Sequence, residues 1–209
     1  HKISLRYPRI INYGLISIIT LFSLLSMLRN YEYKNPLVFW QVSVERNPKS
    51  FLAYDNLARE YKKMGAFREA EWALKKALNY AYPLANKKRV ALNLAKLYSD
   101  FNYPDKAIDL VNSQVLNAAP IPEGAYNFLG AIHLKTGNEK DGLKALRQEM
   151  MRFPQKVDPY INLGIYYIKK EEFDKAEDSF IEALKRDPDN RVAREGLILA
   201  KSKQKLLKE

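Results

Sequence analysis

The 209-residue sequence predicts an all-α protein in which one membrane-spanning helix precedes an α-solenoid of stacked helix pairs. Three observations support this fold class. Residues 10–28 contain no charged side chain, one pattern of aromatic, leucine and small residues recurs between residues 54 and 188, and residues 191–207 form a lysine-rich helical segment. A repeated helix pair needs about 34 residues, so the length suffices for an anchor and about four pairs.

The uncharged run at 10–28 is rich in Ile, Leu and Phe. A helix rises 1.5 Å per residue, so the run extends roughly 30 Å, the thickness of a bilayer core. A cleaved signal peptide would end at a small-x-small site, but Met27, Leu28 and Arg29 stand there instead. A helix buried in a soluble domain would have a polar face, which this run lacks. We therefore expect residues 1–34 to hold an N-terminal tail and one transmembrane helix.

Charges on the two sides of the run predict its orientation. Residues 2–9 include three basic residues and no acid, whereas Arg29, Glu32 and Lys34 give the other side a smaller positive charge. The positive-inside rule then places the N-terminus in the cytoplasm and the long C-terminal part in a periplasm or lumen. The first residue is His1 rather than Met, which leaves open a processed chain or a piece of a longer protein.

The repeated pattern places Leu, then Gly or Ala, between two aromatic residues, and small and large apolar residues follow. The clearest copy is Tyr160, Leu163, Gly164, Tyr167, Phe173, Ala176, Phe180, Ala183 and Pro188. The first copy is Tyr54, Leu57, Ala58, Tyr61, Gly65, Ala70, Leu74, Ala77 and Pro83. Two weaker copies lie between them. A small residue beside large ones on one face lets two helix axes approach closely, so each copy predicts a packed helix pair.

These residues resemble the tetratricopeptide repeat family, whose signature is small residues at the helix crossing and large ones around it. The resemblance implies an array over residues 49–190. The helices that we expect there are 50–64, 68–80, 84–100, 104–117, 123–135, 139–152, 159–170 and 173–186. Residues 35–48 resemble half a repeat that begins at Asn35-Pro36, and residues 191–209 are expected to cap the stack with a polar outer face.

The junction between anchor and array carries a second resemblance. An apolar span ending in Arg29, then Trp40, then Asn56-Leu57-Ala58, is similar to the C-terminal part of protein O-mannosyltransferase-like membrane proteins that carry these repeats. The similarity covers only about 30 residues. It implies the tail of such a protein, without the loops that hold the catalytic acids.

Composition argues against an enzyme and against a metal or cofactor site. There is no cysteine, and the only histidines are His1 and His133, with no second ligand at metal spacing. His133 takes the place that other repeats give to a tyrosine, which indicates packing. The net charge of +11 favours acidic proteins, anionic lipids or nucleic acid. Most of the 14 tyrosines and 9 phenylalanines fall at core positions, so we do not expect nucleic-acid binding.

The candidate partner-binding surface is the groove formed by the first helix of each repeat. Its basic zone is Asp55, Arg59, Lys62, Lys63, Arg89 and Lys96, and its apolar zone is Val157, Ile161, Ile165 and Ile168. An extended partner segment could place acidic groups in one zone and apolar side chains in the other. Alternatively, the lysines form a solvated face and the isoleucines contact the final helix. The Lys and Asn of the family's carboxylate clamp are replaced by Asp55 and Arg59, which disfavours that class of partner.

The sequence therefore predicts a membrane-anchored scaffold that binds partner proteins, as a subunit or assembly factor of a membrane complex. A second interpretation is the C-terminal region of a glycosyltransferase-like membrane protein that presents acceptor proteins. A third is a repeat module that binds anionic lipid or nucleic acid through its basic surface, with steep salt dependence. The partner, the organelle and the oligomeric state are not predicted.

Overall fold

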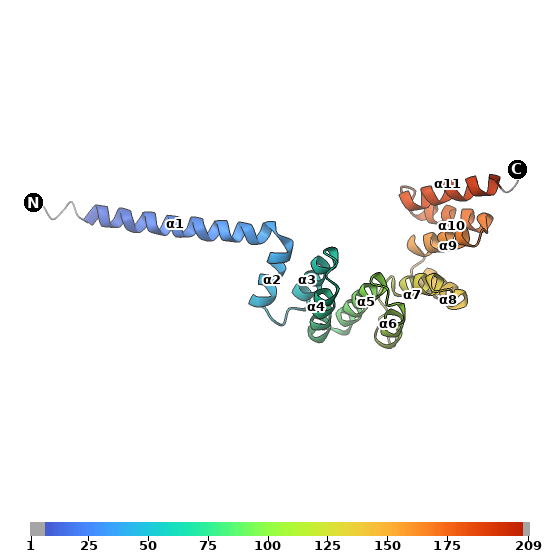
Figure 1. Ribbon diagram of the computed structural model, residues 1–209, viewed down its shortest axis with the longest axis horizontal. Helices are drawn as coiled ribbons and strands as arrows, with labels where there is room; N and C mark the ends of the chain where they lie inside the picture. The colour runs from blue at the N-terminus through green and yellow to red at the C-terminus, as the bar shows by residue number, and fades with distance from the viewer. Residues whose placement is uncertain (1–6, 207–209) are drawn as a thin grey trace, which may run out of the picture. The chain divides into compact units, whose positions relative to one another are not determined.

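The computed structural model describes residues 7–206, except for the side chains of residues 7–12, 28 and 31–33. Over these residues the chain forms eleven α-helices and one short π-helix, with no strand (Figure 1). The predicted all-α class is confirmed for this part of the chain. The chain divides into two compact units, His1–Ala81 and Tyr82–Glu209, which are described in turn.

The first unit begins with the long helix α1, Tyr7–Lys34. Between Tyr13 and Met27, ten large apolar side chains are each 50–71% exposed. Within the described part of the chain, no helix is both long and apolar enough to cross a membrane. The transmembrane helix predicted at 10–28 is therefore not supported, although the side chains of residues 10–12 and 28 lie outside the described ones.

Helix α2, Pro36–Arg46, starts where the predicted half-repeat does. The Asn35 side chain accepts hydrogen bonds from the backbone N–H groups of Leu37 and Val38, at 3.1 and 3.3 Å. A proline in the first turn needs no hydrogen-bond partner for its nitrogen, so Asn35 and Pro36 together define this N-terminus. Helix α2 contacts both α1 and the first helix of the following pair.

The first helix pair consists of α3, Phe51–Lys63, and α4, Phe67–Tyr80. Three alanines of α4 and Ala58 of α3 lie at the crossing, where their exposure is 0–2%. Gly65 makes the turn between the helices with a positive φ of 71°, which favours glycine. This pair matches the first predicted repeat.

The second unit starts with α5, Leu84–Asp100, followed by α6, Pro104–Leu110, and the π-helix η1, Val111–Val115. The sequence predicts one α-helix over 104–117, but the backbone changes at Val111, whose carbonyl accepts from the N–H of Leu116 at 2.9 Å. Lys88 is 1% exposed, and its Nζ donates to the carbonyl of Val115 at 2.9 Å and to that of Ala118. A buried lysine thus satisfies carbonyls that a helix end leaves unpaired.

The next pair is α7, Ala125–Lys135, and α8, Glu139–Arg152. Two glycines let these helices approach: a Cβ at Gly130 would lie 2.8 Å from Leu146, and one at Gly142 would lie 2.7 Å from Leu134. Each helix therefore contributes a glycine that receives a leucine from its partner. A methyl group added at either glycine would therefore push the two helices apart.

The start of α7 is held by a residue of α8. Glu149 is 1% exposed, and its carboxylate accepts hydrogen bonds from the N–H groups of Gly124, Tyr126 and Asn127, at 2.6, 3.1 and 3.2 Å. These are N–H groups that a helix start leaves without an internal partner, and the helix dipole favours an anion there. Glu149 thus caps a helix more than 20 residues before it in the sequence.

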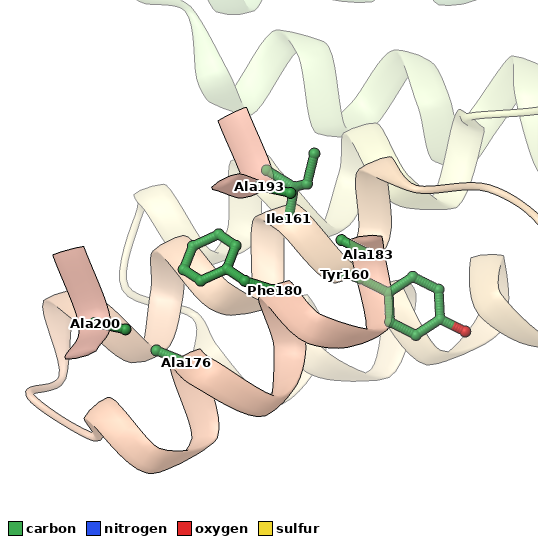
Figure 2. Packing of buried hydrophobic residues seen from close by; sticks show 7 residues of the cluster. All are labelled: Tyr160, Ile161, Ala176, Phe180, Ala183, Ala193 and Ala200. Atoms are coloured by element: carbon green, nitrogen blue, oxygen red, sulfur yellow. The ribbon is translucent and has the colours of Figure 1, made fainter. Parts of the chain in front are cut away.

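The last elements are α9, Asp158–Lys169, α10, Phe173–Arg186, and α11, Arg191–Leu206. Phe180 is 1% exposed, and a Cβ at Gly164 or Gly196 would lie 2.6 or 2.4 Å from its ring. Figure 2 shows this core, in which Ala183 and Ala193 lie with Phe180 in one buried cluster. Helix α11 therefore covers the last pair, as a capping helix would.

Candidate functional site

The first helices of the last two pairs, α7 and α9, contact each other and form an open groove. They are joined by a hydrogen bond of 2.8 Å from Nδ2 of Asn162 to Oδ1 of Asn127. Between them lies a pocket with a volume of about 200 Å³, which we call the α7–α9 pocket. It is lined by Ala131, Leu134, Lys135, Asn162, Ile165, Tyr166 and Lys169.

The α7–α9 pocket combines an apolar floor with two cations. Ile165 is 40% exposed, and Leu134 and Ala131 lie beside it. Lys135 and Lys169 are exposed, and neither has an ion-pair partner among the residues that the structure describes. They stand 34 residues apart, each as the last residue of its helix. The two lysines therefore hold the same place in successive repeats.

One wall of the pocket, the ring of Tyr166, is fixed by the neighbouring pair. Its hydroxyl donates to Oε2 of Glu139 at 2.9 Å, and Lys170 forms an ion pair with the same carboxylate. Burial, together with the hydrogen bond to Glu139, raises the pKa of Tyr166 to about 12. Hydrogen bonds from Lys170 and Tyr166 lower the pKa of Glu139 below its usual 4.5. The carboxylate that holds Tyr166 is thus already paired with a cation, Lys170.

The four predicted apolar residues separate in the structure. Ile165 lines the α7–α9 pocket. Ile161 is only 9% exposed and belongs to the core cluster around Phe180, against which Val157 and Ile168 also pack. This cluster includes residues of α11, as the alternative of contact with the final helix predicts, but Ile168 also lines a pocket beside Phe173 and Leu206. Ile165 is the most exposed of the four, and the role of all four in binding stays a prediction.

The six residues of the predicted basic zone fall in both units. Asp55 on α3 is 3% exposed, so its carboxylate offers little surface to a partner. The other five are exposed: Arg59, Lys62 and Lys63 on α3, and Arg89 and Lys96 on α5. Lys63 pairs with Glu60 of its own helix at 2.8 Å. Their role in binding stays a prediction.

Sequence reasoning identified Ile165 and missed the other six pocket residues, which are Ala131, Leu134, Lys135, Asn162, Tyr166 and Lys169. The offset of 34 residues between the two lysines, equal to one repeat, was a usable signal. Among the described residues no group of three His, Asp or Glu side chains could hold a metal ion. His133 is half-buried, which agrees with the predicted packing position.

The arrangement can be compared with known proteins. Residues 157–190, which comprise α9 and α10, match the family model of the tetratricopeptide repeat. The fold is that of tetratricopeptide repeat proteins. No curated protein matches the chain. No finding supports the resemblance of residues 29–58 to protein O-mannosyltransferase-like proteins.

Solved structures share the tetratricopeptide fold at low sequence identity. The structure of MamA is 24% identical with a TM-score of 0.57, over 75% of this chain and 83% of that one. YrrB, described as a TPR protein with an unusual peptide-binding site, is 22% identical with a TM-score of 0.55, over 83% and 86%. The Cut9-Hcn1 hetero-tetramer of APC/C is 20% identical with a TM-score of 0.67, and the match covers 87% of this chain and 35% of that one.

Proposed function

We propose that this chain is a protein-interaction scaffold that binds segments of partner proteins in the groove between α7 and α9. The observation that carries the proposal is the α7–α9 pocket, which is lined by exposed Ile165 and by two lysines without ion-pair partners among the described residues. An apolar pocket with a few polar groups is the usual form of a binding site. YrrB, which has the same fold, is described as having a peptide-binding site.

The second part of the proposal concerns α1. Ten apolar side chains exposed over fifteen residues form a larger apolar surface than water-exposed helices normally carry. We propose that a lipid membrane covers this surface, with the N-terminus in the cytoplasm and the repeats in the periplasm or lumen. Attachment would raise the local concentration of partners in the same membrane, so weak groove contacts would suffice. The chain would then act as a subunit or assembly factor of a membrane complex.

The groove is tested by capture of partners from detergent-solubilised native membranes with three forms of the full chain. Ile165→Arg puts a charge on the pocket floor, whereas Ile198→Arg makes the same change on α11, where Ile198 is 70% exposed. We expect a defined set of partners to be lost with Ile165→Arg and kept with Ile198→Arg. If Ile165→Arg retains all of them, the groove is not the binding surface.

Membrane attachment is tested by flotation of the full chain with lipid vesicles. The wild type should float, whereas Ile18→Glu/Leu21→Glu/Leu25→Glu should remain in the aqueous fraction because three buried carboxylates are costly in lipid. The same kind of change at three exposed apolar positions of α11, Val192→Glu/Ile198→Glu/Leu199→Glu, controls for altered charge and apolar content and should leave flotation unchanged. A triple α1 variant that floats as well as the wild type would exclude attachment through α1.

A further inference from the structure

The chemistry of the α7–α9 pocket points to one class of partner segment. Resting on the proposed function, we infer that the pocket binds a bulky apolar side chain of an acidic segment, while Lys135 and Lys169 bind carboxylates on either side of that side chain. The inference assigns a ligand chemistry to these two lysines, which the basic zone predicted from sequence does not include.

The size of the pocket fits one side chain. At about 200 Å³ it is smaller than the roughly 300–1,000 Å³ of sites that enclose drug-sized ligands. Its floor of Ala131, Leu134 and Ile165 is apolar, and the ring of Tyr166 is held in place by Glu139. A single leucine, methionine or phenylalanine of a partner can bury itself there. Asn162 also lines the pocket and can bond to the partner's backbone.

The charges at the rim are complementary to acids. Both lysines end their helices, where the helix dipole favours cationic side chains. Glu139, the acid next to Tyr166, is neutralised by Lys170, and no described acid pairs with Lys135 or Lys169. An acidic segment would therefore supply the missing counter-charges, and a basic segment would be repelled.

The repeat spacing suggests how far apart the acids are. Packed helices lie about 8–10 Å apart, and an extended chain advances about 3.3 Å per residue. Side chains on one face of an extended chain recur at every second residue, so the apolar residue and both acids must occupy alternate positions to face the pocket together. The expected motif is therefore an acid, a bulky apolar residue two positions later, and a second acid two positions after that. The two acids then lie roughly 13 Å apart, a span that long lysine side chains on neighbouring helices can reach.

The test selects peptides from a phage library of random dodecapeptides against the immobilised full chain in detergent. Four forms are compared: wild type, Ile165→Arg, Lys135→Glu/Lys169→Glu, and the control Lys140→Glu/Lys144→Glu. The control changes the charge equally at two exposed lysines of α8 that do not line the pocket. Helix content and melting temperature are checked for each form, so that loss of fold is not mistaken for loss of binding.

We expect wild type and control to select peptides with an apolar residue between acids, and Lys135→Glu/Lys169→Glu to select basic flanks instead. The best synthetic peptide should bind the pocket variant about tenfold or more weakly, because two attractions become repulsions. If the peptides depend on Ile165 but carry no acids, or if the charge reversal leaves the selection unchanged, this inference is wrong and the proposed groove stands. If no selected peptide is lost with Ile165→Arg, the proposed groove itself fails.

Discussion

Two neighbouring residues of helix α9, Gly164 and Ile165, lie on two different faces of the helix. Gly164 is buried where Phe180 of α10 packs against it, whereas Ile165 is 40% exposed in the groove towards α7. The first face is completed by the chain's own residues, and the second is open. The residues of the repeat pattern therefore build the packed face, while the open face stays accessible to a partner. Substitutions on the first face should cost stability, and those on the second should cost binding.

The largest expected effect is on the packed face. Phe180→Ala removes a ring that is 1% exposed and sits against the helix backbones of α9 and α11. We expect the free energy of unfolding to fall by about 3–5 kcal/mol, measured by urea unfolding followed by the circular dichroism of the helices. Ile198→Ala on the exposed side of α11 should change it by less than about 0.5 kcal/mol. Equal effects of the two substitutions would mean that Phe180 does not organise this core.

The sharpest contrast uses neighbouring residues. Gly164→Val would place Cβ about 2.6 Å from the Phe180 ring, so the helices must separate. We expect a loss of about 2 kcal/mol or more from overpacking. Ile165→Val, one residue further, removes one methylene from a half-open site and should cost less than about 1 kcal/mol. Thermal unfolding of both variants decides this, and a Gly164→Val chain as stable as Ile165→Val would break the distinction between the faces.

A third test concerns a polar contact of the packed side. Glu149→Gln replaces one of the oxygens that accept from Gly124, Tyr126 and Asn127 by an NH₂ group, which cannot accept. We expect a loss of about 1–3 kcal/mol in unfolding free energy. Glu123→Gln, at an exposed carboxylate paired with Lys156, should cost far less. Hydrogen exchange should show faster exchange at the start of α7 in Glu149→Gln only.

The smallest effect concerns Tyr166 on the open face. Its pKa is about 12 in the folded chain and about 10 in the unfolded one, so the folded state favours the neutral hydroxyl. This contribution to stability is fully present below about pH 10 and is lost as the pH rises through about 12. Ultraviolet titration should show a tyrosine with this high pKa that is absent from Tyr166→Phe. In Glu139→Gln the pKa of Tyr166 should fall, and an unchanged titration would show that Glu139 does not hold the ring.

The sequence predicted most of the fold because close helix packing leaves a periodic pattern. Gly164, Phe180 and the alanines around them marked the last pair, and the predicted helices 84–100 and 173–186 coincide with α5 and α10. The polar caps could not be predicted in this way. Glu149 and Lys88 bond to backbone groups more than 20 residues away, and no periodicity marks such contacts.

The candidate site was predicted only in part, for a related reason. Ile165 was identified by helical spacing, but the same spacing selected Ile161 and Ile168, which pack in the core. Spacing on one helix defines a face about 100° wide, and the neighbouring helices decide which part of that face they cover. Lys135 and Lys169 become a pair only when α7 and α9 lie side by side.

The most direct test of the open face is photo-crosslinking in native membranes from a benzophenone side chain placed at position 165 of the full chain. The same side chain at position 198, which is more exposed, is the control. A partner in the groove predicts a discrete cross-linked protein from position 165 that is absent from position 198 and is outcompeted by the selected acidic peptide. Identical cross-links from both positions, or none from position 165, would contradict the account.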